Sequence, residues 1–455
     1  LYSWCGKRLV ENPELVFSKE VTEYQPPLFP LAIALSHLLA PPQIAPRLIP
    51  AVFGILGIVL IYRLGAILGS RFGGLLGATL LTFNHFHRLL SLRILSDIPV
   101  AAAITMLVYC LHRYDRTRKR SWGAALGLIA GLSVWMKWSG ALGILLMAVY
   151  FLAKRLRRME PLGLKRSLFP ISISLAICVP LVVNNYLKFG SLLPESSALR
   201  GEFYIGPPWF YLAHLPSLLT WPVLSFVLIG FLFSFKSQGD EKWLLLPWFL
   251  LFFLAISLVG EKDPRYLLPA LPPLFLLSGT GTDRLIALVS RERQRSVARS
   301  GAFALLLLLS LRPYFVGTNL VESATRRHIG YKEAGEWLRK HAPTDALIYA
   351  GSPRAVRLSS GFNYEEFGGP IRLLPDSRNS FERAVLGEKR PLFLEVDIWD
   401  FGQPRWVYPP TAERVKWLMD LGFKPQFVYR VNVETDRGPL NQPGVIIFSM
   451  EPYEG

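Results

Sequence analysis

Long apolar runs divide this sequence, and they limit what it can fold into more than any other feature. Most of them are roughly 15–22 residues long, close to the ~20 that a helix needs to cross a ~30 Å hydrocarbon core. Short polar stretches separate one run from the next. The sequence therefore predicts a polytopic α-helical membrane protein over most of its length.

We predict about ten membrane helices, which together make residues 48–317 a multi-span transmembrane domain. The run at Ala141–Leu152 is short and must borrow flanking residues to cross the bilayer. The predicted helices are Leu48–Leu68, Phe72–Leu89, Ile98–Leu111, Trp122–Met136, Ala141–Leu152, Leu168–Leu187, Leu215–Phe235, Trp243–Val259, Tyr266–Val289 and Gly301–Val316.

The loops between these helices carry their Lys and Arg residues unevenly, and this bias predicts the orientation. One set of alternate loops holds 18 Lys and Arg residues, whereas the other set holds six. Cytoplasmic loops are the ones enriched in Lys and Arg. We therefore expect a multi-pass cell-membrane protein with residues 1–47 and 318–455 outside the cytoplasm. Residues 1–47 contain no apolar segment that could carry them across the membrane. We therefore expect one further span, running outward, upstream of Leu1.

The two flanking regions differ in character. Residues 1–47 read as an outer loop with interfacial helices, in which Phe29–Ala40 is apolar but too short to span and either lies along the interface or re-enters. Residues 318–455 alternate helical and strand patterns, which predicts a small, at least partly parallel sheet. We predict helices at Tyr331–His341 and from the Thr411 cap to Leu421. We predict strands at Ala346–Ala350, Ile371–Leu374, Leu392–Ile398, Phe427–Val433 and Val445–Met450.

The net charge of +17 would suit a nucleic-acid-binding protein, but its distribution does not. Residues 320–455 contain 18 basic and 18 acidic residues, so the whole surplus lies among the apolar runs. We therefore predict no nucleic-acid partner. The three cysteines form no spacing typical of a metal site or a disulfide framework.

Ionisable residues gather at the outer ends of the predicted helices, where they are functional candidates. This outer rim consists of Arg88, Arg93, Asp97, Lys137, Lys262, Asp263 and Arg265. Each of these residues also has a structural interpretation. Lys and Arg at helix ends can extend to the lipid headgroups, and Asp97 can cap its helix. Arg93 and Asp97 can also pair with each other. Transfer of a sugar from a lipid phosphate needs a carboxylate to activate the acceptor and cations to stabilise the departing phosphate. This outer rim contains both residue types.

The order of short motifs along the chain resembles that of the dolichyl-phosphate-mannose protein mannosyltransferase and aminoarabinose transferase group, which has the GT-C fold. The resemblance covers nearly the whole chain. It is carried by Leu1–Trp4 through Asn12-Pro13, Pro26-Pro27-Leu28, Arg47-Leu48, Arg93 with Ser96-Asp97, Lys137, and Arg265-Tyr266-Leu267-Leu268-Pro269.

This resemblance implies a glycosyltransferase that takes a sugar from a polyprenyl- or dolichyl-phosphate donor on the outer face, with inversion. It implies a catalytic role for Asp97 and phosphate contacts from Arg93, Lys137 and Arg265. The principal base of the family would lie immediately before Leu1. Relatives often carry a charged residue or His just before the proline pair; here Gln25 stands there, with Glu23 two residues earlier as the candidate contact. Some relatives use a divalent metal and others none, so the resemblance leaves the cofactor open.

Two other functions remain open at this stage. A transporter or flippase of lipid-linked saccharides is the main rival, although such proteins often show inverted repeats and midplane charges. A membrane scaffold with a docking domain is the third reading. The expected partners are membrane lipids, the lipid-phosphate sugar and an acceptor that is a protein, a lipid or a glycan.

Overall fold

The computed structural model describes the chain in two compact units, Tyr2–Val321 and Glu322–Gly455. Each unit is considered by itself below. The described residues are 2–18, 25–41, 44–156, 163–190, 206–235, 242–260, 262–289, 291–326, 329–365, 368–399, 403–435 and 438–451.

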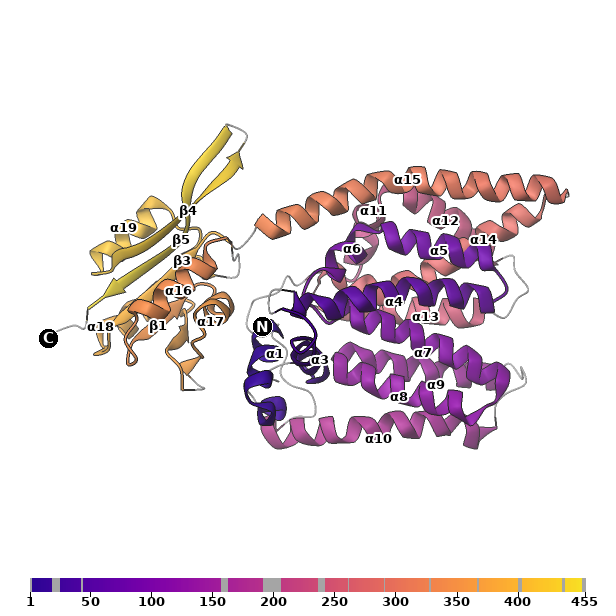
Figure 1. Ribbon diagram of the computed structural model, residues 1–455, viewed down its shortest axis with the longest axis horizontal. Helices are drawn as coiled ribbons and strands as arrows, with labels where there is room; N and C mark the ends of the chain where they lie inside the picture. The colour runs from indigo at the N-terminus through magenta and orange to yellow at the C-terminus, as the bar shows by residue number, and fades with distance from the viewer. Residues whose placement is uncertain are drawn as a thin grey trace. The chain divides into compact units, whose positions relative to one another are not determined.

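The first unit is a bundle of helices that run side by side (Figure 1). It opens with two short helices, α1 (Tyr2–Glu11) and α3 (Leu28–Ser36), and the 3₁₀ turn η1 (Pro13–Phe17). The remaining elements are α4 (Ala45–Ile67), α5 (Arg71–Phe83), α6 (His85–Ser91), α7 (Asp97–Thr117), α8 (Arg120–Met136), η2 (Trp138–Gly140), α9 (Ala141–Leu156), α10 (Leu164–Phe189), α11 (Phe210–Leu219), α12 (Trp221–Phe235), α13 (Lys242–Leu258), η4 (Pro264–Ala270), α14 (Leu271–Ala287) and α15 (Glu292–Arg326).

Every predicted run is helical, but two of them are broken. A third, Tyr266–Val289, begins as the 3₁₀ helix η4 and becomes α-helical only at Leu271. Asn84 ends α5 and caps α6, because its side chain accepts a hydrogen bond from the backbone N–H of His87 at 2.9 Å. Thr220 has a positive φ of 64° between α11 and α12, which are bent by 111°. A non-glycine residue in this backbone region cannot continue a helix. The runs Phe72–Leu89 and Leu215–Phe235 were therefore each predicted wrongly as one continuous helix.

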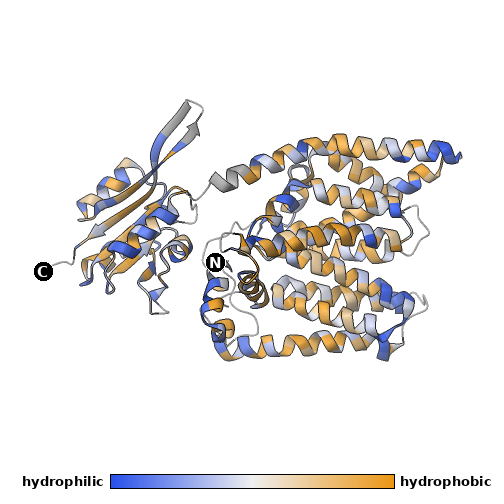
Figure 2. Ribbon diagram, viewed as in Figure 1, coloured by the Kyte–Doolittle hydropathy of each residue, from blue (hydrophilic) through white to orange (hydrophobic). Residues whose placement is uncertain are grey.

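The class of protein is confirmed as a polytopic helical membrane protein. Among the described residues, four helices are long and apolar enough to span a bilayer, or up to five if the bent pair counts as one. These four segments are Ala45–Ile67, Trp138–Leu156, Leu164–Lys188 and Glu292–Val321. Apolar residues cover most of the helix bodies (Figure 2). The full count of about ten spans stays a prediction.

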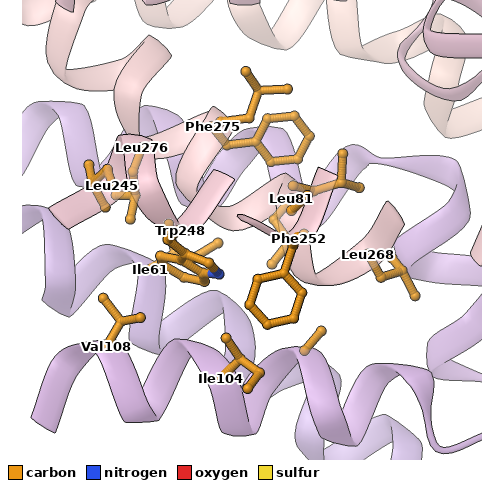
Figure 3. Packing of buried hydrophobic residues seen from close by; sticks show 14 of the residues in the cluster. Ile61, Leu81, Ile104, Val108, Leu245, Trp248, Phe252, Leu268, Phe275 and Leu276 are labelled. Atoms are coloured by element: carbon orange, nitrogen blue, oxygen red, sulfur yellow. The ribbon is translucent and has the colours of Figure 1, made fainter. Parts of the chain in front are cut away.

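Large apolar side chains fill the centre of the bundle, where α4, α7, α13 and α14 meet (Figure 3). Trp248 on α13 is fully buried, and so are Ile61 on α4, Val108 on α7 and Phe275 on α14. Because lipid tails are as apolar as these side chains, the stabilisation comes from close van der Waals packing and not from the exclusion of water. This packing fixes the helices that carry the polar residues at their ends.

Glycines allow three helices to approach closely beside that core. A Cβ atom at Gly65 on α4 would lie 2.3 Å from the Cα of Gly74 on α5. A Cβ atom at Gly279 on α14 would lie 2.2 Å from the carbonyl oxygen of Gly73. Small residues at such crossings are typical of helix pairs in membranes. Any side chain at these positions would push α5 away from its neighbours.

The segment predicted at Phe29–Ala40 forms α3, which is indeed too short to cross a bilayer. Phe29 and Ile33 are completely buried. The hydroxyl of Ser36 donates a hydrogen bond to the carbonyl oxygen of Ala45 at 2.7 Å, which ties α3 to the start of α4. The helix is therefore an integral part of the bundle, and its depth in the bilayer stays a prediction.

The second unit is a five-stranded sheet with the order β2-β1-β3-β5-β4. Strand β1 (Leu347–Ala350) pairs in parallel with β2 (Ile371–Leu373) and β3 (Leu392–Asp397). Strand β5 (Gly438–Met450) pairs antiparallel with both β3 and β4 (Lys424–Thr435). The predicted partly parallel sheet is thus confirmed, with an antiparallel hairpin at one edge.

The helices of this unit follow local signals in the sequence. Helix α16 (Tyr331–His341) has the predicted bounds. The side chain of Thr411 accepts a hydrogen bond from the backbone N–H of Arg414 and caps α19 (Ala412–Asp420), as predicted. Two further helices, α17 (Pro353–Ser360) and α18 (Arg378–Leu386), were not predicted.

Candidate functional site

The structure brings Asp97 and Lys137 together at one end of the helical bundle. The Lys137 Nζ atom donates to the Asp97 Oδ1 atom at 2.5 Å. The Asp97 side chain is 5% exposed and that of Lys137 is 18% exposed. A charge-assisted hydrogen bond of this kind is stronger when water is largely excluded. The pair joins the first turn of α7 to the end of α8, 40 residues further along the chain.

This contact shows that the carboxylate of Asp97 has a partner outside its own helix. Ser96 is the N-cap residue of α7, and its side chain makes no capping hydrogen bond. Asp97 is the first residue inside the helix, where the helix dipole favours a negative charge. The alternative that Asp97 acts as the cap is therefore wrong, because its carboxylate turns towards Lys137.

Arg265 lies near this ion pair, on the short 3₁₀ helix η4. Its backbone N–H donates to Asp263 Oδ1 at 2.9 Å, so that Asp263 caps the helix. The Arg265 Nε atom lies 3.0 Å from Asp263 Oδ2, without the alignment of a hydrogen bond, and the contact is an ion pair. Arg265 also interacts electrostatically with Asp97. The site thus contains two cations and two carboxylates.

The ring of Tyr266 contacts both cations. The Lys137 Nζ atom lies 4.9 Å from the centre of this ring, and the guanidinium carbon of Arg265 lies 5.3 Å from it. Cations within about 6 Å of an aromatic ring are attracted to its electron-rich face. Tyr266 belonged to the arginine–tyrosine motif in the sequence, but its role between the two cations was not predicted.

A second tyrosine connects the N-terminal helix to the same site. The hydroxyl group of Tyr2 lies 3.2 Å from the Ser96 Oγ atom, next to Asp97. The ring of Tyr2 packs edge-on against Phe29 at 4.7 Å. Tyr2 therefore links α1 to the residue that precedes α7 and, through Phe29, to α3. Tyr2 belongs to the opening motif of the chain, but the sequence assigned it no role, because its neighbour Ser96 is 94 residues away.

Not all of the predicted residues join this cluster. Arg93 lies exposed in the turn before α7. Since α7 begins only at Asp97, the two residues do not share a helix, and Asp97 pairs with Lys137 instead. Pairing between neighbours on one helix is thereby removed, and an electrostatic interaction of Arg93 with Asp97 stays a prediction. Glu23 lies outside the described residues.

Two other charged residues of the predicted rim, Lys262 and Arg88, bind backbone carbonyl oxygens of the bundle. Lys262 is 5% exposed, and its Nζ atom donates to the carbonyl oxygens of Ser257 at 2.7 Å and Ile256 at 3.3 Å, at the end of α13. A cation is favourable there because the last carbonyls of a helix lack partners. Arg88 donates to the carbonyl oxygen of Tyr314 at 2.7 Å and ties α6 to α15.

The described arrangement can bind an anionic group better than a cation. A lysine ammonium has three N–H donors and an arginine guanidinium has five. Lys137 can therefore retain its hydrogen bond to Asp97 and still donate to an oxygen atom of a ligand. Arg265 can donate to two oxygen atoms of a ligand at once. Within the part of the chain that the structure describes, no group of three His, Cys, Asp or Glu side chains is arranged to hold a metal ion.

The sheet unit contains a separate cluster of polar side chains that is enclosed. Glu395 and Asp397 on β3 are completely buried. The Ser352 hydroxyl donates to Asp397 Oδ2 at 2.6 Å and its N–H donates to Glu395 Oε2 at 3.0 Å. Burial and these two carboxylates raise the pKa of Tyr331, whose hydroxyl donates to Ser352 Oγ at 2.8 Å. The cluster was not predicted, although two acidic residues on one face of an apolar strand were the signal for it.

Comparison with known proteins bears on the class of this protein. Residues 24–183 match the family described as dolichyl-phosphate-mannose-protein mannosyltransferase. The chain is 31% identical over 212 residues to the undecaprenyl phosphate-alpha-4-amino-4-deoxy-L-arabinose arabinosyl transferase of Pseudomonas savastanoi pv. phaseolicola (strain 1448A / Race 6). That alignment covers 42% of this chain and 37% of the relative, little more than a third of its length.

Solved structures resemble the chain over a greater length. ArnT from Cupriavidus metallidurans in the apo state has a TM-score of 0.67 at 13% identity, over 98% of this chain and 92% of ArnT. The oligosaccharyltransferase of Archaeoglobus fulgidus in the apo form has a TM-score of 0.59 at 12% identity, over 87% of this chain and 65% of that protein. At these identities the likeness shows the fold.

Together these findings define the class of protein. The chain is a polytopic membrane protein with the GT-C fold and a small C-terminal α/β unit. Its predicted resemblance to the dolichyl-phosphate-mannose protein mannosyltransferase and aminoarabinose transferase group is confirmed.

Proposed function

We propose that this protein is a glycosyltransferase that moves a sugar from a polyprenyl-phosphate donor to an acceptor on the extracytoplasmic face. The observation that carries the proposal is the Asp97–Lys137 ion pair with Arg265 beside it, at one end of a bundle with this fold. A solved ArnT structure of the same fold is described as bound to undecaprenyl phosphate. A structure of the Archaeoglobus oligosaccharyltransferase is described as a complex with dolichol-phosphate.

In this proposal the cations bind the phosphate of the donor. Lys137 is held in place by Asp97 and Tyr266, and Arg265 is held by Asp263. Negative charge grows on the phosphate as the bond to the sugar breaks, and positioned cations stabilise that charge. Asp97 carries the candidate catalytic carboxylate, and its contact with Lys137 favours a role in orienting the cation. Arg93 and Glu23 remain candidate substrate contacts.

The orientation follows from the loop charges. We place the Asp97–Lys137 cluster and the sheet unit on the extracytoplasmic side because the opposite loops hold 18 of the basic residues. There the sheet unit can guide an acceptor. The acceptor is a protein hydroxyl, a lipid or a glycan, and the assay below includes all three.

The test is transfer by the protein reconstituted in proteoliposomes with radiolabelled polyprenyl-phosphate sugars and each class of acceptor. We expect Arg265→Ala to raise the donor concentration needed for half-maximal transfer by about tenfold or more, since a charge-assisted hydrogen bond contributes ~1.5–3 kcal/mol. The matched control is Arg299→Ala. Arg299 forms a similar pair with Asp283 at 2.9 Å, outside the cluster.

Three outcomes would contradict the proposal. Movement of the labelled lipid across the bilayer without a covalent product would indicate a transporter. Absence of both transfer and movement would indicate a scaffold. If Arg265→Ala and Arg299→Ala changed the donor concentration for half-maximal transfer equally, Arg265 would not contact the donor phosphate.

A further inference from the structure

A cavity of about 280 Å³ lies at the other end of the helical bundle, lined by α4, α7, α9 and α13. Asp115 lines it from α7, 18 residues beyond Asp97 on the same helix. At 1.5 Å per residue the two positions are about 27 Å apart. The cavity is therefore separate from the Asp97–Lys137 cluster, and the loop charges place it on the cytoplasmic side.

One wall of the cavity is polar. Asp115 Oδ2 accepts hydrogen bonds from Lys154 Nζ at 2.7 Å and from the Tyr150 hydroxyl at 3.0 Å. His112 and Arg116 line the same wall from α7. With His112 neutral, the lining carries two cations and one carboxylate, so its net charge is positive by one.

The second carboxylate oxygen of Asp115 has no hydrogen-bond donor among the described residues. Asp115 is only 5% exposed, yet its Oδ1 atom accepts no hydrogen bond from any described residue. Arg118 Nη1 lies 3.9 Å away, beyond hydrogen-bond distance. A buried carboxylate oxygen without a donor is costly. A ligand that brings a hydroxyl or ammonium group to Oδ1 would remove that cost.

The part of the lining that comes from α4 and α13 is an apolar wall. It is formed by Ile67 and Leu68 at the end of α4 and by Trp243, Leu246 and Leu250 on α13. Such a wall suits a hydrocarbon chain, whereas a small soluble phosphate would leave it uncovered. The combination of one polar and one apolar wall between membrane helices is typical of a lipid headgroup site.

We infer that this cavity binds an anionic phospholipid of the cytoplasmic leaflet whose headgroup has one phosphate and a hydroxyl donor, as in phosphatidylglycerol. The phosphate meets Arg116 and Lys154, the hydroxyl donates to Asp115 Oδ1, and an acyl chain lies along α13. The single negative charge of this lipid balances the single positive charge of the lining. The inference is independent of the proposed sugar transfer.

The experiment compares lipid binding by the whole protein and two charge variants. The protein is placed in phosphatidylcholine nanodiscs with increasing phosphatidylglycerol, and bound lipid is counted by native mass spectrometry. We expect Arg116→Gln to weaken phosphatidylglycerol retention about tenfold, as the loss of one charge-assisted hydrogen bond requires. Arg155→Gln removes the same charge from an exposed neighbour that does not line the cavity. It should retain the lipid like the wild type.

Three results would overturn the inference. Equal weakening in both variants would show a general attraction to basic loops. Retention of phosphatidylcholine as strongly as phosphatidylglycerol would exclude recognition of the headgroup. Displacement of the lipid by millimolar glycerol 3-phosphate would show that the cavity binds a soluble phosphate.

Discussion

The Asp97–Lys137 pair allows its structural and functional contributions to be separated by a double-mutant cycle. Removing one partner of a fully buried ion pair costs roughly 3–5 kcal/mol. The Lys137 side chain is 18% exposed and that of Asp97 is 5% exposed. We therefore expect Asp97→Asn to cost less, about 2 kcal/mol, because the lysine can turn to water. Lys137→Met should cost about 3 kcal/mol, because it leaves the carboxylate buried.

The double variant removes both charges. It should be at least ~2 kcal/mol more stable than the sum of the two single losses predicts, since neither charge is left buried alone. Transfer should not recover, because the cation that we assign to the donor phosphate is absent. Loss of one such group typically lowers turnover roughly 10²–10³-fold. Denaturant unfolding in detergent measures the stability, and transfer of radiolabelled sugar in proteoliposomes measures the activity.

A similar pair at the other end of α7 provides the control. Lys154 Nζ contacts Asp115 Oδ2 at 2.7 Å, with side chains 18% and 6% exposed. Asp115→Asn and Lys154→Met should each lower the free energy of unfolding, and the double variant should recover part of the summed loss. Transfer should stay near the wild-type rate in all three proteins. If the Asp97→Asn/Lys137→Met protein transferred sugar like the wild type, the pair would be structural only and the assignment would be refuted.

Two further predictions concern the sheet unit and the orientation. Hydrogen bonds from Arg390 lower the pKa of Glu388 to about 2; a lowered pKa adds stability above the ordinary carboxyl range that is lost as the pH falls from about 4.5 to 2. Because the pair is partly exposed, we expect it to contribute less than about 1 kcal/mol to the free energy of unfolding. Thermal unfolding of the whole protein at pH 6 and pH 3 measures this contribution, which should be absent in Glu388→Gln. An identical pH dependence in that variant would contradict the assignment. For the orientation, a membrane-impermeant maleimide added to intact cells should label Lys332→Cys, whereas Arg155→Cys should need permeabilised cells, and the reverse pattern would invert the topology.

Local chemistry in the sequence was sufficient for much of the fold. Apolar runs of membrane length can satisfy their backbone groups in a bilayer only as helices or closed barrels, and the predicted runs are helical apart from the breaks at Asn84 and Thr220. The Thr411 cap and the bounds of Tyr331–His341 followed from residues a few positions apart. Parallel pairing of β1, β2 and β3 followed from the alternation of helices and strands.

Contacts between distant residues needed the tertiary structure. Asp97 and Lys137 are 40 residues apart, and only the packing of α7 against α8 and η2 gives the carboxylate a partner other than its own helix end. The bend at Thr220 and the cavity at Asp115 likewise depend on several helices at once. The sequence by itself determined which segments are helices and which residue types lie at their ends. Tertiary packing decided which of those residues meet, because a side chain in a low-dielectric interior pairs with whatever group the fold places within reach.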